Sequence, residues 1–181
     1  MAAITITEAL AELKTMGKRI MSKREYVGNF LARQDGIKDP LEKDGGSIEV
    51  IKRERQAISD LETRHVAIRT AIQKVNQSTP ITIAETTKTI AEWLTWRKEI
   101  APGAQAFVGK MRNSIIQVRA QAQQKGWGVI ATATTAATQP TDFVINADEA
   151  ELAKQAEQFE TILGTLDGQL SLKNATVTID V

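Results

Sequence analysis

Apolar residues recur at alternating spacings of three and four over long stretches of this 181-residue chain. Such spacing places side chains on one face of an α-helix. In the first stretch, the pattern predicts a helix over about residues 6–34. Thr5 and Glu8 have the spacing of a capping box, in which each side chain pairs with an otherwise unbonded backbone N–H at the helix start. The predicted apolar face consists of Leu10, Leu13, Gly17, Ile20, Val27 and Leu31, with Arg24 filling the gap between the last three.

A loop and a second helix follow. Residues 36–46 contain Asp39-Pro40 and Gly45-Gly46, which are typical of turns, and they show no apolar period. The spacing of three and four then returns and predicts a helix over about residues 48–75. Two long helices joined by one loop form an antiparallel hairpin. The predicted face of the second helix consists of Ile51, Ile58, Leu61, His65, Ile68, Ile72 and Val75.

Residues 81–124 are predicted to form a further long helix that begins at a second capping box, made of Thr82 and Glu85. Pro102 interrupts this helix, so we expect either a kink or two consecutive helices that meet near Ala101. The predicted face consists of Ile83, Ile90, Leu94, Ile100, Phe107, Met111, Ile115 and Val118.

The composition changes after Gly126 to small and β-branched side chains. Residues 128–134 are therefore predicted to form a strand or an extended flap. Trp93 and Trp96, three residues apart, are predicted to pack in the core against this segment rather than to form an exposed anchor for a partner.

The last part of the chain is predicted to form a helix and a strand. Asn146 with Glu149 marks the start of the helix, and residues 175–181 alternate as a strand does. Such a strand must pair with another one. The predicted face of the helix consists of Leu152, Ala156, Phe159, Leu163, Leu166 and Leu170.

The two halves of the sequence resemble each other. Residues 4–8, Ile-Thr-Ile-Thr-Glu, recur at 81–85 as Ile-Thr-Ile-Ala-Glu, and the ends of the return helices correspond at a constant offset of 98. We interpret the chain as a duplicated unit, with a first helical hairpin over 1–80 and a second over 81–181 that carries an extended insertion at 126–146. One continuous domain is the alternative. The predicted fold class is mainly α, with long antiparallel hairpins forming a bundle or an elongated pair. Short strands over 3–5, 80–83 and 175–181 are expected to gather at one end.

The residue types exclude several kinds of chemistry. The chain has no cysteine and a single histidine, His65, so a thiol nucleophile and most zinc sites are excluded. His65 lies on the predicted apolar face, where a core or boundary position explains it. No serine, lysine or carboxylate is paired with a catalytic partner by a recognisable spacing. We therefore predict no catalytic, cofactor-binding or metal-binding residues, no cofactor, and no enzyme activity.

Targeting signals and membrane spans are not recognisable in the sequence. No basic stretch followed by an apolar region begins the chain, so no secretion signal is predicted. The longest charge-free run, residues 126–141, is too short and too polar to span a bilayer. No membrane partner is expected.

Charge is distributed unevenly along the chain. Residues 1–125 hold 21 Lys/Arg and 14 Asp/Glu, whereas residues 126–181 hold 2 and 8, respectively. This asymmetry favours docking of an acidic end on a basic face, within a subunit or between copies. The alternative is a nucleic-acid surface, for which the candidate contacts are Lys18, Arg19, Lys23 and Arg24.

The Ile-Thr-Ile-x-Glu segments, the long basic helix, the loop rich in Asp and Gly and the return helix ending at asparagine together resemble small helical-hairpin proteins encoded among the structural genes of tailed bacteriophages. The resemblance implies a structural or accessory protein of the virion, present in many copies, bound to capsid or tail proteins and assembled in the host cytoplasm.

The function expected from the sequence is that of a non-enzymatic structural protein that assembles into a homo-oligomer and with other virion proteins. An unpaired edge strand can extend a neighbour's sheet, and an extended segment can become ordered on contact with another subunit. A helical nucleic-acid-binding or packaging-associated protein is the alternative. The candidate assembly interface consists of Trp127, Val129, Ile130, Phe143, Val177, Ile179 and Val181.

Overall fold

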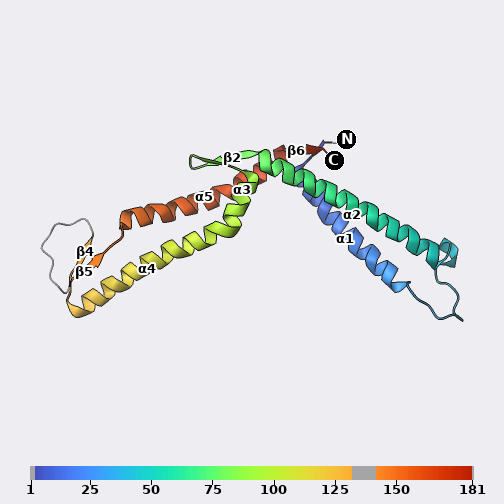
Figure 1. Cartoon of the computed structure of the whole chain (residues 1–181), viewed down its shortest axis with the longest axis horizontal. Helices are drawn as coiled ribbons and strands as arrows, with labels where there is room; N and C mark the ends of the chain where they lie inside the picture. Colours follow the sequence, from blue (N-terminus) through green and yellow to red (C-terminus); the bar gives the residue numbers. More distant parts are fainter. Residues whose placement is uncertain (1–2, 132–141, 181) are drawn as a thin grey trace. The chain divides into compact units, whose positions relative to one another are not determined.

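The chain has a mainly α fold, as the sequence predicts. The computed structural model describes residues 3–131 and 142–180 (Figure 1). It divides into two compact units: one comprises Met1–Ser78 with Ser171–Val181, and the other comprises Thr79–Leu170. The division after Ser78 lies close to residue 80, and residues from Ser171 onward pack with the first hairpin.

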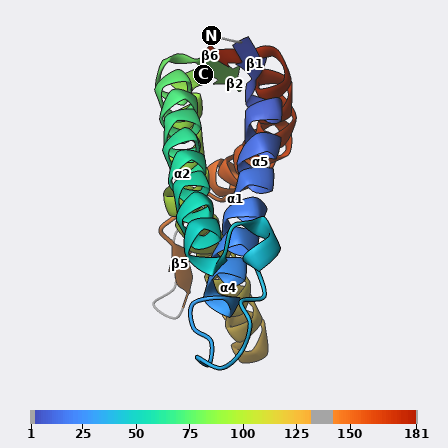
Figure 2. The ribbon, with the colours of Figure 1, turned by 90° about the vertical axis from the view of Figure 1, so that its right-hand side faces the viewer.

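The first unit is a hairpin of two long helices. Strand β1 (Ala3–Thr5) leads into α1 (Ile6–Asn29), and α2 (Ser47–Ser78) returns beside α1, as both views show (Figures 1 and 2). Ion pairs join the two helices along their length: Lys23 with Glu54, Arg24 with Glu62 and Arg64 with Glu12. These partially exposed pairs each contribute little, but they fix which faces of the helices meet.

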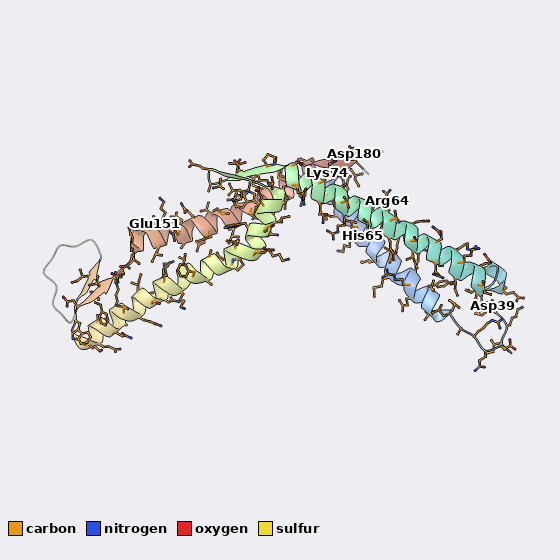
Figure 3. All side chains as sticks on the ribbon, in the orientation of Figure 1. Asp39, Arg64, His65, Lys74, Glu151 and Asp180 are labelled. Atoms are coloured by element: carbon orange, nitrogen blue, oxygen red, sulfur yellow. The ribbon has the colours of Figure 1, made fainter. Side chains whose placement is uncertain are left out.

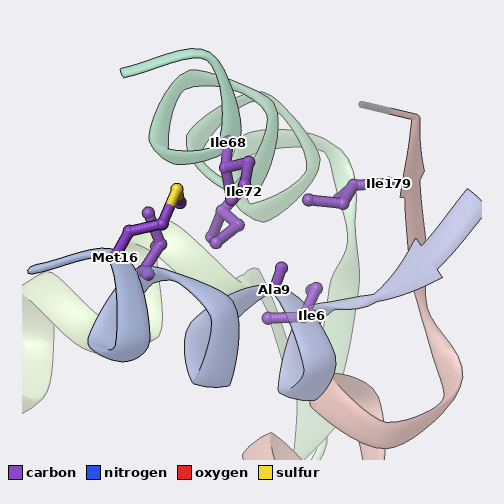
Figure 4. Close-up of a cluster of buried hydrophobic side chains, with 7 residues drawn as sticks. Ile6, Ala9, Met16, Ile68, Ile72 and Ile179 are labelled. Atoms are coloured by element: carbon purple, nitrogen blue, oxygen red, sulfur yellow. The ribbon is translucent and has the colours of Figure 1, made fainter. Parts of the chain in front are cut away.

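The core of this unit is closed by a strand from the far end of the sequence. Helix α5 (Glu149–Thr176) ends in β6 (Thr178–Asp180), which pairs antiparallel with β1. Figure 4 shows Ile179 of β6 pointing at side chains of α1 and α2. The predicted strand is thus confirmed over 178–180. The buried cluster consists of Ile6, Ala9, Leu13, Met16, Ile68, Ile72 and Ile179.

The first helix differs from its prediction in length and in face. It ends at Asn29 rather than near residue 34. Leu10 is 39% exposed, and Ala9 and Met16 are buried in its place. The apolar stripe therefore starts at Ile6, directly after the capping residue Thr5, and runs through Ala9 and Met16 in place of Leu10 and Gly17.

The loop between α1 and α2 is organised by one carboxylate. Asp39 accepts hydrogen bonds from the backbone N–H of Leu41 (2.9 Å), from the backbone N–H of Ser47 (2.8 Å) and from the Ser47 hydroxyl (2.5 Å). These bonds lower the pKa of Asp39 from 3.8 to about 2, with the Ser47 hydroxyl as the largest cause. Because Gly45 and Gly46 have φ values of 101° and 92°, the chain can turn here into α2 after the short 3₁₀ helix η1 (Glu42–Asp44).

The second unit begins with a β-hairpin: the strand expected over 80–83 is confirmed, but the helix predicted from residue 81 begins only at Ile90. Strand β2 (Pro80–Ile83) pairs with β3 (Thr86–Thr89), and Ala84 and Glu85 form the turn with φ values of 46° and 65°. Thr82 hydrogen-bonds across the hairpin to Thr87 (2.8 Å between hydroxyls), so Thr82 and Glu85 form no capping box. The β-branched residues on both sides favour the extended conformation.

The helix that follows the hairpin contains a wide turn before Pro102. Helix α3 (Ile90–Thr95) continues through the π-helical turn η2 (Trp96–Ile100) into α4 (Ala101–Lys125), and Figure 1 shows the helical path bending there. The Ala101 N–H donates to the Trp96 carbonyl, five residues earlier. Proline has no N–H and its ring crowds the carbonyl four residues before it, so a widened turn relieves the strain. The predicted junction near Ala101 is confirmed.

The tryptophans pack in the core, but against different elements from those predicted. Trp93 is 1% exposed and donates from Nε1 to the Ile81 carbonyl (3.0 Å). Trp96 stacks on Phe159 of α5 with the ring centroids 6.2 Å apart. Their partners among the described residues are therefore the β-hairpin and α5.

The insertion is described only at its two ends. Strand β4 (Val129–Ala131) pairs in parallel with β5 (Phe143–Ile145), so part of the predicted strand at 128–134 is confirmed, and residues 132–141 lie outside the described part. The last helix is capped by Asp148, whose Oδ1 accepts from the N–H groups of Ala150 and Glu151. Asn146, the predicted start, precedes it.

At the beginning of the internal repeat, the residues that correspond in the structure differ from those that the sequence predicted. Thr89 and Glu92 form the counterpart of the Thr5–Glu8 box: in both, the threonine N–H donates to the glutamate at 2.7 Å and the glutamate N–H donates to the threonine hydroxyl at 3.2 Å. The predicted offset of 98 holds at the end of each return helix. Residue 6 donates its N–H to the carbonyl of residue 177, and residue 90 donates to that of residue 79.

The strained turn of the β-hairpin is a target for stabilisation. Non-glycine residues with positive φ cost about 1 kcal/mol each, and Asn-Gly suits a two-residue turn with positive φ at both positions. We predict that Ala84→Asn with Glu85→Gly raises the free energy of unfolding by about 1 kcal/mol, measured by urea denaturation. Glu85→Gln keeps the strained backbone and should change little. An unchanged or lowered stability of the double variant would contradict the strain assignment.

The loop carboxylate predicts a pH dependence. The folded pKa of Asp39 lies below its ordinary value, so its contribution to stability is present above pH 3.8 and is lost as pH falls toward 2. We predict that the difference in unfolding free energy between wild type and Asp39→Asn is constant near neutral pH and shrinks below pH 3.8. Asp35→Asn in the same loop is the control. A difference independent of pH would show that the carboxylate charge is not what organises the loop.

Candidate assembly surface

The structure brings four of the proposed interface residues together. Trp127, Val129, Ile130 and Phe143 lie where α4 ends and the strands β4 and β5 pair. The Trp127 and Phe143 ring centroids are 5.7 Å apart, and Lys125 Nζ lies 4.3 Å from the Trp127 ring centroid. Trp127 remains 37% exposed.

The backbone at Gly126 positions this cluster. Gly126 has a φ of 67°, and the Trp127 N–H donates to the Ala122 carbonyl (2.9 Å), which ends α4. The Gly128 N–H then donates to Asp142 Oδ1 (2.9 Å), and a Cβ at Gly128 would approach that atom to 2.8 Å. A glycine at each of these two positions therefore allows the chain to turn back against β5.

The remaining proposed interface residues lie elsewhere. Ile179 is 3% exposed in the core of the first unit, and Val177 is half-buried against the same core. The sequence led us to expect an unpaired strand at Ile179. Instead, β6 pairs with β1. Val181 lies outside the described residues.

An apolar groove extends from this cluster along one side of α4 and α5. Phe107, in α4, is 61% exposed, and Val144, in β5, is 49% exposed. Phe107 belongs to the apolar helix face predicted from the sequence, and that face lines open surface here. The main apolar lining consists of Phe107, Met111, Ile115 and Val118 of α4, Phe143 and Ile145 of β5, and Phe159 and Ile162 of α5.

A second groove lies on the other side of the same two helices. Its lining residues have the spacing of a different helix face from those of the first groove. Val108, Ile115 and Phe159 contribute to both grooves, so they mark the line between them. We call this second groove the charged groove. Its charged and exposed apolar lining residues are Arg112, Ile116, Arg119, Glu149 and Glu160.

Both grooves exist because α4 and α5 lie apart. Their Cα atoms are more than 8 Å from each other along almost their whole length, whereas α1 and α2 repeatedly approach more closely. Among the described residues, the ion pairs that join residues 90–125 to α5 are Arg97 with Asp167 and Arg119 with Glu149. Between these two ion pairs, side chains of α4 and α5 line open surface instead of a buried core.

The basic residues proposed for nucleic acid are partly engaged within the first unit. Lys23 and Arg24 pair with Glu54 and Glu62 of α2, at 2.5 Å in each case. Lys18 and Arg19 make no ion pair with the described residues. Two unpaired cations remain from the predicted basic run.

Residues with catalytic or metal-binding chemistry are scattered. Figure 3 shows His65 on α2, where it is half-buried, and Asp39 in the loop at the end of the hairpin. Within residues 3–131 and 142–180, no group of three or more His, Asp or Glu could hold a metal ion. Over the same residues, no helix combines the length and the apolar character that crossing a bilayer requires.

Comparison with known proteins identifies a structural neighbour. No protein-family model matches the chain, and no curated protein matches it significantly. A solved structure, that of a functionally unknown conserved protein from Corynebacterium diphtheriae, is similar over 99% of this chain and 100% of that one, with a TM-score of 0.53 and 16% sequence identity. At this identity the similarity concerns the fold alone.

The left-handed backbone at Gly126 predicts that a side chain at this position destabilises the protein. Alanine at a positive φ costs about 1 kcal/mol, so Gly126→Ala should lower the free energy of unfolding by about that amount, as measured by urea denaturation. Gly103→Ala is the matched control, because Gly103 lies in α4 with no atom near its Cβ position. There the same substitution should be neutral or stabilising. Equal effects at the two glycines would contradict the role assigned to Gly126.

Proposed function

We propose that this protein is a non-enzymatic structural protein that acts through protein–protein assembly and forms a homo-oligomer. The observation that carries the proposal is the apolar groove, which joins the Trp127–Phe143 cluster to exposed side chains of α4 and α5. Exposed apolar surface of this kind marks sites of interaction between proteins.

The composition of the groove supports an apolar partner surface. Phe107, Met111 and Val118 contribute apolar walls, while Lys110, Ser114 and Asn146 are polar groups at the same site. An apolar centre with polar neighbours is the usual composition of a protein interface. Burying one large apolar side chain contributes about 1.5–3 kcal/mol, so a few contacts of this kind stabilise an assembly.

The setting proposed for this assembly is the particle of a tailed bacteriophage. The resemblance of the helical hairpins and their capping segments to phage structural proteins is the support for it. The protein would then be a capsid or tail accessory component, present in many copies and assembled in the host cytoplasm. The nucleic-acid alternative has less support, because Lys23 and Arg24 are engaged in ion pairs with α2.

The groove variant Phe107→Gln tests the proposal. Light scattering behind a sizing column should show the wild type as a multimer larger than a dimer at both low and moderate salt, because apolar contacts are not screened by ions. Phe107→Gln should reduce this multimer to smaller species while the helical content is retained.

The matched control is Val66→Gln in α2, since Val66 is 64% exposed and Phe107 is 61% exposed. Val66→Gln should leave the multimer unchanged. A wild-type protein that is monomeric under all conditions, or a multimer insensitive to Phe107→Gln, would contradict assembly through the apolar groove.

A further inference from the structure

The charged groove has basic residues on one wall and acidic residues on the other. Helix α4 carries four Lys/Arg and no Asp/Glu, whereas α5 carries five Asp/Glu and two Lys/Arg. Arg112 and Arg119 line the α4 wall, and Glu149 and Glu160 line the α5 wall. The groove therefore presents two complementary charged surfaces side by side.

Ion pairs among the described residues neutralise only part of this charge. Arg119 pairs with Glu149, but Arg112 and Glu160 form no ion pair with any described residue although they line the same stretch of the groove. Between the two arginines, Ile116 is 64% exposed. Opposite it, Ala153 and Ala156 present small side chains that another helix can approach closely.

We propose that the charged groove is a self-association surface on which a second copy of this chain packs, with α4 of each copy on α5 of the other. This arrangement deepens the proposed assembly role, since it names the partner and the surface of one of its contacts. The occupant follows from the charges, because the acidic wall of one copy is the complement of the basic wall of the next.

The charges also select the symmetry of the pair. A two-fold axis perpendicular to the helices places α4 on α4 and brings Arg112 and Arg119 of both copies together, which is repulsive. An axis parallel to the helices places α4 on the partner's α5 and keeps residues at the same level along the helices. Arg112 then meets the partner's Glu160, and Ile116 reaches the small residues of the partner's α5.

The resulting four helices alternate in charge. Each basic α4 has two acidic α5 neighbours, one from its own chain and one from the second copy. All neighbouring helices are antiparallel, as in an ordinary four-helix bundle. The exposed Ile116 becomes buried at the centre of each α4–α5 contact.

Charge reversal tests this arrangement. Arg112→Glu and Glu160→Lys each place like charges opposite one another, so each should weaken the dimer by about tenfold or more in Kd, as measured by analytical ultracentrifugation. An equimolar mixture should form a heterodimer, because the reversed α4 of one variant then faces the reversed α5 of the other. Ile116→Asp should abolish the dimer without rescue.

Matched controls carry the same charge changes in the first unit. Arg55→Glu and Glu25→Lys alter exposed residues that form no ion pair with the described part of the chain, and both should leave the dimer intact. Circular dichroism confirms folding of each variant. Phe107→Gln should leave the dimer unaffected, which separates this contact from the apolar groove.

The outcomes distinguish this inference from the proposed function. Dimers insensitive to Arg112→Glu and Glu160→Lys, or variants that are weakened but not rescued by mixing, would overturn the α4-on-α5 arrangement while leaving assembly through the apolar groove standing. Dimers that respond as expected, with no larger multimer, would support this inference and contradict the proposed apolar contact. A wild-type monomer at the highest attainable concentration would overturn both.

Discussion

In each unit, a short antiparallel pair of strands fixes where a helix begins. In both units, a two-stranded ladder ends at a threonine that caps the next helix, and the first helical N–H is bonded to the chain leaving a return helix. In the first unit, the ladder therefore fixes the beginning of α1 against the end of α5, which is distant in sequence, whereas β2 and β3 of the second unit are joined by a two-residue turn. In the first unit, the partner strand comes from the end of the chain, which ties residues 178–180 to residues 3–5.

The helices pack differently in the two units. In the first, three ion pairs and a continuous apolar cluster bring α1 and α2 together. In the second, the β-hairpin and two tryptophans form a core. Beyond the wide turn before Pro102, α4 and α5 remain apart. The side chains that would seal a helical hairpin instead line two grooves, one apolar and one charged. The surface proposed for assembly thus follows from incomplete helix packing in the second unit.

Much of the architecture could be predicted from the sequence because it depends on local periodicity and capping. The second helix, the Thr5–Glu8 cap and the final strand were predicted from residue spacing, and the junction near Ala101 was predicted from Pro102. The turn and the second strand of the β-hairpin were missed because Ala84 and Glu85 lack the Gly or Asn that usually marks such a turn. The grooves could not be predicted, because an apolar stripe such as Phe107 to Val118 has the same spacing whether or not another helix covers it.

Side-chain footprinting with hydroxyl radicals tests the central claim, that the protein assembles through α4 and α5, most directly. Reactivity of the full chain is compared between dilute and concentrated solution by mass spectrometry. Phe107 and Ile116 should lose reactivity on concentration, whereas Met21 and Val66, equally exposed residues of the first unit, should not. Protection of Met21 and Val66 with Phe107 and Ile116 unchanged would place the contact on the other unit and contradict the account.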